Sequence, residues 1–284
     1  MLLGTRISNT EPVAVRDADV VARYDTTDPA YVVKDSSNRI SALLDKSKRL
    51  QTTTKLDSGN LTINKVYIIV ATTVDYFGTG RIVGNMFVAA TALALSANNS
   101  VREVLGNHIT QTDTNKMPLH VYDNATKEWF ALFDGVDDYL QNINIPLYQP
   151  TNIYMCLKQN SWTYPDYIFN LGSNDLLTLN QGNISPGLRL QNNTNQNSNL
   201  NIGIYGNLFV NLINNGRIKV NNSIIVDFNI ALPQSFNGIT LGARNTGTLY
   251  FSHISVKEII IKRIATDESD TIFNYFKNKH KVVY

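Results

Sequence analysis

Residues 133–140 read Phe-Asp-Gly-Val-Asp-Asp-Tyr-Leu, and this stretch decides the expected fold. Phe133 and Leu140 are the apolar ends of two strand-like runs, in which apolar and polar residues alternate. Asp134 and Gly135 between them are typical of a tight turn, because glycine tolerates a positive φ. The sequence therefore predicts a hairpin. Its structural residues are Phe133, Asp134, Gly135, Asp137, Asp138 and Tyr139.

The composition favours a β protein. The chain has 284 residues, enough to bury a core, and it combines 17% charged residues with 14 tyrosines and 11 phenylalanines. A net charge of +2 gives no reason to expect nucleic acid. The single cysteine, Cys156, excludes an internal disulfide framework and lies in an apolar run, so we expect it to be buried. No apolar stretch is long enough to predict membrane insertion, and no signal peptide is recognisable, so we expect synthesis in a cytoplasm.

Both ends of the chain carry local signals. Residues 1–22 alternate over short runs and contain Pro12, which predicts an extended arm that docks either on its own domain or on a neighbouring subunit. Near the other end, Thr266 can cap a helix, acidic residues follow it, and lysines crowd the last turn. The sequence therefore predicts one short C-terminal helix.

The stretch 133–140 resembles the signature hairpin of concanavalin A-like (laminin-G-like) jelly rolls in bacterial surface and bacteriophage virion proteins. Three further segments are similar to motifs of that family: Arg23-Tyr24-Asp25 through Asp28, Leu44-Asp45-Lys46-Ser47, and Gly242-Ala243-Arg244 with the strand that follows over 254–263. Leu44 stands where an aromatic residue is common. The resemblance implies an all-β jelly-roll sandwich of two antiparallel sheets, followed by one short helix.

Residues 55–107 interrupt this pattern. They resemble a small all-β module of phage tail and fibre proteins, through strand runs around 61–70, the Asp75-Tyr76-Phe77 loop and the run 83–90. The expected division is an N-terminal arm at 1–22 for attachment or oligomerisation, a jelly roll at 23–54 and 108–284, and an inserted β module at 55–107. So short a module makes a marginal core alone, so we expect it to pack on the main domain or on a neighbour.

The sequence offers little support for catalysis. Glucanases that share this fold carry a Glu-x-Asp-x-x-Glu strand, and none of the glutamates here begins that motif: Glu11, Glu103, Glu128, Glu258 and Glu268. The histidines lack the spacing of a metal site. We therefore expect no enzyme, no catalytic residue and no metal site, with calcium in the oxygen-rich loop 134–138 as the one cofactor left open.

A loop-like stretch could bind carbohydrate. It combines aromatic rings with a carboxylate, and its candidate residues are Trp162, Tyr164, Asp166 and Tyr167. The alternative is that Trp162 packs over the edge of a sheet. The many asparagines between 170 and 222 likewise fit either tight turns or hydrogen bonds to sugars.

Two functions follow, with a third behind them. The first is a non-enzymatic structural protein of a tailed bacteriophage virion, such as a head fibre, a decoration protein or a tail component. It implies other virion proteins as partners, a homo-oligomer, and contact with a host surface glycan. The second is a carbohydrate-binding adhesion module. A glycoside hydrolase is the third, disfavoured by the missing carboxylate pair.

Overall fold

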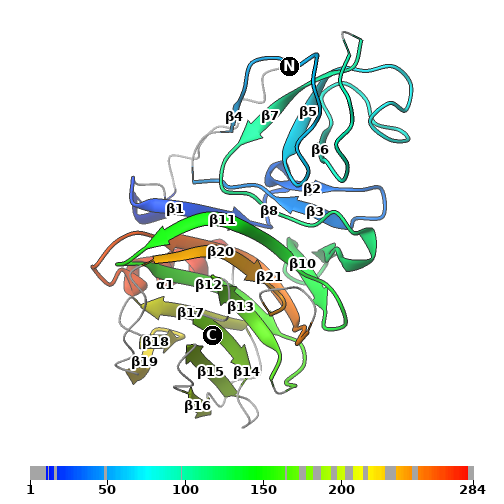
Figure 1. The fold of residues 1–284 in the computed structure, drawn as a ribbon. Helices are drawn as coiled ribbons and strands as arrows, with labels where there is room; N and C mark the ends of the chain where they lie inside the picture. Colours follow the sequence, from blue (N-terminus) through cyan, green and yellow to red (C-terminus); the bar gives the residue numbers. More distant parts are fainter. Residues whose placement is uncertain are drawn as a thin grey trace.

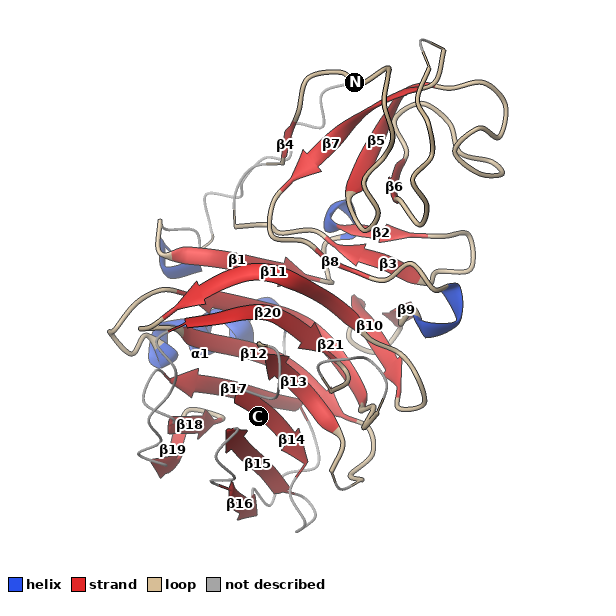
Figure 2. Ribbon diagram, viewed as in Figure 1, coloured by secondary structure: helices blue, strands red, loops and turns tan. Residues whose placement is uncertain are grey.

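Two large antiparallel sheets form most of the computed structural model, with a smaller sheet beside them and one helix on an outer face (Figures 1 and 2). This architecture confirms the predicted all-β sandwich with a C-terminal helix. The structure describes residues 11, 13–15, 18–47, 50–96, 98–163, 165–172, 177–181, 187–192, 197–201, 207–213, 217–227, 235–244 and 249–280.

Sheet A is centred on β12 and β21. In spatial order it contains β19 (Ser223–Asp227), β18 (Arg217–Val220), β17 (Asn207–Ile213), β12 (Asn152–Gln159), β21 (His253–Lys262), β10 (Glu128–Asp134) and β9 (Leu119–Asp123). The edge of β21 that faces away from β12 pairs with two different strands. Its first half pairs with β10, and its second half pairs with β1 (Val20–Asp25).

Sheet B faces sheet A across the core. In spatial order it contains β16 (Asn197–Asn201), β15 (Gly187–Asn192), β14 (Leu177–Gln181), β13 (Tyr167–Leu171), β20 (Ser235–Leu241), β11 (Leu140–Tyr148), β8 (Ile109–Thr110), β3 (Ile40–Leu43) and β2 (Val32–Lys34). Two short 3₁₀ turns precede β2 and β9, at Pro29–Tyr31 and Thr114–Lys116.

Alternation along the central strands explains their apolar composition. Ile153, Met155 and Leu157 of β12 point into the core between the sheets, whereas Tyr154 and Cys156 point to the outer face of sheet A. There they lie under helix α1 (Ser269–His280), so both faces of this strand are buried. Cys156 is buried, as the sequence predicts.

The stretch 133–140 is a turn between the two sheets, and the predicted hairpin is wrong in this respect. Phe133 and Asp134 end β10 in sheet A, whereas Leu140 begins β11 in sheet B. The two strands do not pair with each other, because both edges of each are taken by other strands: β9 and β21 for β10, and β20 and β8 for β11. Gly135 does adopt the expected positive φ, of 79°.

Helix α1 and the segment before β1 cover one end of the outer face of sheet A. Ser269 N donates to Asp267 Oδ1 at 2.9 Å, so Asp267 makes the capping bond that the sequence analysis expected of Thr266. Val15, in the 3₁₀ turn Val13–Val15, is fully buried in the same apolar cluster as the helix. The described part of the predicted arm thus docks on its own chain, and residues 1–10 lie outside the described residues.

The smaller sheet has the order β4 (Gln51–Thr52), β7 (Ser100–Leu105), β5 (Val66–Ala71) and β6 (Met86–Val88). Val66, Val88 and Val104 share a buried cluster with Val33 and Leu44 of the large sandwich. The small sheet therefore packs on the main domain, beside β2 and β3. The proposed boundaries at residues 55 and 107 stay a prediction.

Among the described residues, no helix has the length and apolar character that crossing a membrane requires.

Candidate functional site

Three connections between the sheets meet at one end of the sandwich. They are the turn 134–140, the segment 159–167 between β12 and β13, and the segment 241–253 between β20 and β21. Register places them together, because Asp134 pairs with His253 and Gln159 pairs with Ile254. The acidic turn and the predicted sugar-binding loop are therefore neighbours in space, which their sequence separation does not reveal.

A groove of about 680 Å³ lies on the outer face of sheet A, beside this end. It crosses four adjacent strands, β9, β10, β21 and β12, where helix α1 does not cover them. The side formed by the β9–β10 hairpin is mixed. It combines the half-buried apolar side chains of Val121, Phe130 and Leu132 with the more polar Tyr122, Asp123, Asn124 and Thr126. The opposite wall is polar, formed by Lys158, Asn160, His253 and Ser255. The strand period of two puts these side chains on one face.

The polar wall is partly preorganised by its own contacts. Asn160 Nδ2 donates to Ser255 Oγ at 2.9 Å, which fixes the amide, and Asn160 N donates to His253 O at 2.9 Å. Lys257 closes the end toward the helix, and its Nζ lies 2.6 Å from Glu128 Oε2. Lys158 is exposed beside this wall. The groove can therefore hold a ligand that has an apolar face and several hydroxyl groups.

The predicted sugar-binding residues occupy different environments. Trp162 is half-buried and packs against the main core, which is closer to the alternative of a packed ring than to that of a sugar-binding ring. Tyr167 is only 5% exposed, so its ring is closed to a ligand in this conformation. Asp166 is half-buried, and this burial raises the pKa of its carboxyl to about 6. Tyr164 lies outside the described residues.

Sequence reasoning missed Tyr250, which stacks on Tyr167 with a centroid distance of 5.5 Å and an angle of 19° between the rings. Tyr250 is 38% exposed and stands at the same end of the sandwich. The apolar pattern Leu249-Tyr250-Phe251 reads as the start of a buried strand, so it carries no signal of an exposed ring. Sequence reasoning also missed the part of the polar wall that lies on β21. His253 and Ser255 read only as the outward-facing positions of a strand.

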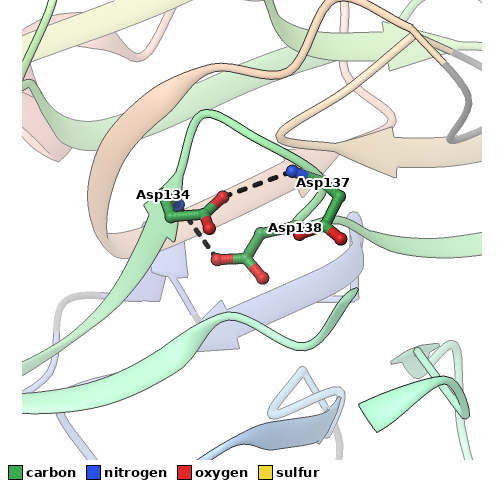
Figure 3. Close-up of side chains that lie close together, drawn as sticks. All are labelled: Asp134, Asp137 and Asp138. Carbon is green, nitrogen blue, oxygen red and sulfur yellow. Dashed lines mark hydrogen bonds between the residues drawn. The ribbon is translucent and has the colours of Figure 1, made fainter. Parts of the chain in front are cut away.

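The acidic turn holds its own backbone (Figure 3). Asp134 Oδ1 accepts from Asp137 N at 3.3 Å, and Asp138 Oδ2 accepts from Asp134 N at 2.9 Å. Asp134 Oδ1 also accepts from Val136 N at 2.8 Å. One oxygen from each of Asp134, Asp137 and Asp138 lies within 4.8 Å of the others. Burial of Asp138, reinforced by the charges of the other two, raises its pKa to about 7. This geometry fits a turn held by side chains, and calcium stays the cofactor that the sequence leaves open.

A buried ionic cluster lies under helix α1, away from the groove. Glu258 is fully buried, and its carboxylate contacts Arg23 Nε at 2.6 Å, Lys279 Nζ at 2.6 Å and His280 Nε2 at 3.0 Å. Burial alone would raise the pKa of Glu258, but Arg23 and Lys279 outweigh it and hold that pKa well below its usual value. Glu11 adds two 2.8 Å bonds to the guanidinium of Arg23. The cluster ties the N-terminal segment, β1, β21 and α1 together.

The chain matches no protein-family model and no curated protein sequence. Among solved structures it is similar to an arabinofuranosidase complexed with arabinofuranosyl-alpha-1,2-xylobiose, at 12% identity and a TM-score of 0.46, over 91% of this chain and 62% of that one. It is also similar to the binding domain of botulinum neurotoxin serotype D/C, at 14% identity and a TM-score of 0.38, over 90% and 52% of the two chains. The VIP36 exoplasmic/lumenal domain follows at 10% identity and a TM-score of 0.33, over 51% and 80%. This chain thus spans 62% and 52% of the length of the first two.

Enzymes among these neighbours contradict the prediction that the chain is not an enzyme. They include a GH54 α-L-arabinofuranosidase at 11% identity and Trypanosoma rangeli sialidase at 9%, with TM-scores of 0.48 and 0.41. The prediction relied on the absence of known catalytic motifs, above all the glucanase carboxylate pair, and glycosidases such as sialidases use other groups. The prediction is therefore wrong as stated, and these low TM-scores assign no activity in its place.

Proposed function

We propose that this chain is a glycan-binding protein, and that the groove on the outer face of sheet A holds the glycan. The observation that carries the proposal is that apolar side chains of β10 lie in the same groove as a polar wall from β12 and β21. A sugar ring has an apolar face of C–H groups, which fits against Phe130 and Leu132, and hydroxyl groups at its edge, which fit the amide of Asn160 and the hydroxyl of Ser255. Lys158 and His253 supply further polar groups at the same wall.

A panel of immobilised oligosaccharides tests this proposal with one variant and one control. Asn160→Ala removes the amide from the polar wall, so we expect it to weaken binding about tenfold, or 1.4 kcal/mol. Asn115→Ala removes an exposed amide outside the groove and should leave binding unchanged. Chromatography of each bound glycan after incubation shows whether it is also cleaved. The proposal fails if the intact chain binds no member of the panel, or if the two variants behave alike.

We propose, second, that the groove is displayed on a bacteriophage particle by an oligomer of this chain, made in the host cytoplasm. Support comes from the sequence resemblance to virion proteins, together with a small β sheet packed beside the sandwich, where the resemblance places a phage-type module. Light scattering of the intact chain and of a chain lacking residues 1–10 tests the assembly. This deletion keeps Glu11, so it leaves the bonds to Arg23 intact. We expect an oligomer that becomes a monomer on deletion; a monomer in both cases contradicts the proposal.

A further inference from the structure

Tyr250 has an unfavourable backbone conformation. Its φ is +59°, in the left-handed region, which the Cβ of a bulky residue makes unfavourable. Glycine would adopt the same backbone without that cost. Strained positions of this kind persist where the surroundings impose them, and they concentrate at binding sites.

The surroundings hold the Tyr250 ring in one place. Tyr167, buried beneath it, stacks at 5.5 Å between ring centroids, and Tyr167 N donates to Tyr250 O at 2.9 Å. The guanidinium carbon of Arg244 lies 5.8 Å from the centre of the Tyr250 ring. The ring nevertheless stays 38% exposed, and the neighbouring Leu249 is 52% exposed. A strained backbone and two neighbours thus present a fixed aromatic ring to solvent.

Tyr250 is separated from the groove by only a short length of chain. Tyr250 precedes His253, which lines the groove, by three residues, so their Cα atoms are at most about 11 Å apart. A short oligosaccharide can span that distance. Exposed aromatic rings bind the apolar faces of sugars, and a ring that is already fixed loses little conformational entropy on binding.

We propose that Tyr250 is a stacking subsite for an oligosaccharide whose neighbouring residues occupy the groove. This inference rests on the proposed function and adds the ligand's length and a specificity-determining residue. It predicts that oligosaccharides bind more tightly than the corresponding monosaccharides, and that the difference depends on Tyr250.

The test uses Tyr250→Gly, because this change removes the ring that would bind the glycan and at the same time relieves the strain in the backbone. Glycine relieves the backbone strain, and this gain offsets the packing lost with the ring, so the melting temperature of the variant should stay close to that of the intact chain. Its affinity for oligosaccharides should nevertheless fall about tenfold. Tyr250→Phe keeps the ring and should keep the affinity. Tyr148→Ala is the matched control: Tyr148 is 48% exposed, with Arg263 5.1 Å from its ring centre, but it stands at the opposite end of β11.

The probes are gluco-, galacto-, arabino-, N-acetylglucosamine and sialyl oligosaccharides, each compared with its monosaccharide by calorimetry. Equal oligosaccharide affinity of the intact chain and Tyr250→Gly overturns the inference, while a loss in Asn160→Ala still supports the groove. A loss in Tyr250→Phe as large as in Tyr250→Gly also overturns it, since stacking does not need the hydroxyl. Absence of binding by the intact chain overturns the proposed function and this inference together.

Discussion

Replacing Glu258 with glutamine removes the central charge of the buried cluster under helix α1. The carboxylate contacts Arg23 and Lys279 at 2.6 Å each and His280 at 3.0 Å, and its side chain is fully buried. Glutamine has nearly the same shape, so packing is kept and the charge is lost. The cations then remain buried with one acid fewer to balance them, and this imbalance lowers the free energy of unfolding.

The size of the effect follows from these contacts. At an effective dielectric constant of about 20, two charges about 4 Å apart attract by about 4 kcal/mol. The cost of desolvating the carboxylate offsets part of this attraction. Breaking one partner out of a buried ion pair costs about 3–5 kcal/mol. We therefore expect Glu258→Gln to lower the free energy of unfolding by about 3–5 kcal/mol, a large share of the stability of an ordinary domain.

Urea unfolding followed by tryptophan fluorescence measures this loss. With a slope of about 2–3 kcal/mol per molar urea, the midpoint should fall by about 1–2 M. Glu103→Gln is the matched control, because Lys65 Nζ contacts Glu103 Oε1 at 3.0 Å while the side chain of Lys65 is 55% exposed. An exposed pair contributes about 1 kcal/mol or less, so this midpoint should move by less than about 0.5 M.

The dependence on pH gives a second readout. The pKa of Glu258 is lower in the folded chain than in the unfolded chain, so its stabilisation is complete above the unfolded pKa, near 4.3, and is lost as the pH falls toward the folded value. The difference between the intact chain and Glu258→Gln should therefore shrink as the solution is acidified from neutral pH. Equal losses for Glu258→Gln and Glu103→Gln, or a difference that stays constant in acid, would refute the reasoning.

Three further predictions concern the end of the sandwich that carries the candidate site. Burial and the neighbouring acids raise the pKa of Asp138 to about 7, so the free energy of unfolding should fall by about 2–4 kcal/mol between about pH 4 and pH 7. Urea unfolding at several pH values should show that Asp138→Asn abolishes this fall. An unchanged profile in the variant contradicts the assignment. Gly242→Ala places a Cβ 2.4 Å from Phe133 Cδ1 at a φ of +87°, so it should lower the free energy of unfolding by about 2–5 kcal/mol. Gly80→Ala, with a φ of +74° and open space around it, should lower it by about 1 kcal/mol. Equal melting temperatures for the two variants would contradict this prediction. Adding calcium should leave Tm unchanged, because oxygens of the acidic turn already accept backbone N–H groups; a rise that EDTA reverses would show that the turn binds the ion.

Local signals in the sequence were reliable where neighbours along the chain decide the structure. The C-terminal helix forms at Ser269–His280, because its acidic start, apolar face and basic end act within a few residues of one another. Gly135 adopts a positive φ in the predicted turn, and Cys156 is buried in its apolar run. The all-β class likewise follows from alternation and from the many aromatic residues.

Tertiary structure decided everything that depends on which strands become neighbours. The turn 133–140 has the same local sequence whether it closes a hairpin or joins two sheets, and only the partners of β10 and β11 settle the matter. The groove gathers side chains from four strands, and the cluster of Glu258 joins residues as distant as Arg23, 235 positions away along the chain. Tyr250 reads as an apolar strand residue, and it becomes an exposed ring because Tyr167 and a strained backbone hold it there. Alternation along one strand determines which residues share a face, whereas pairing between strands determines what that face meets.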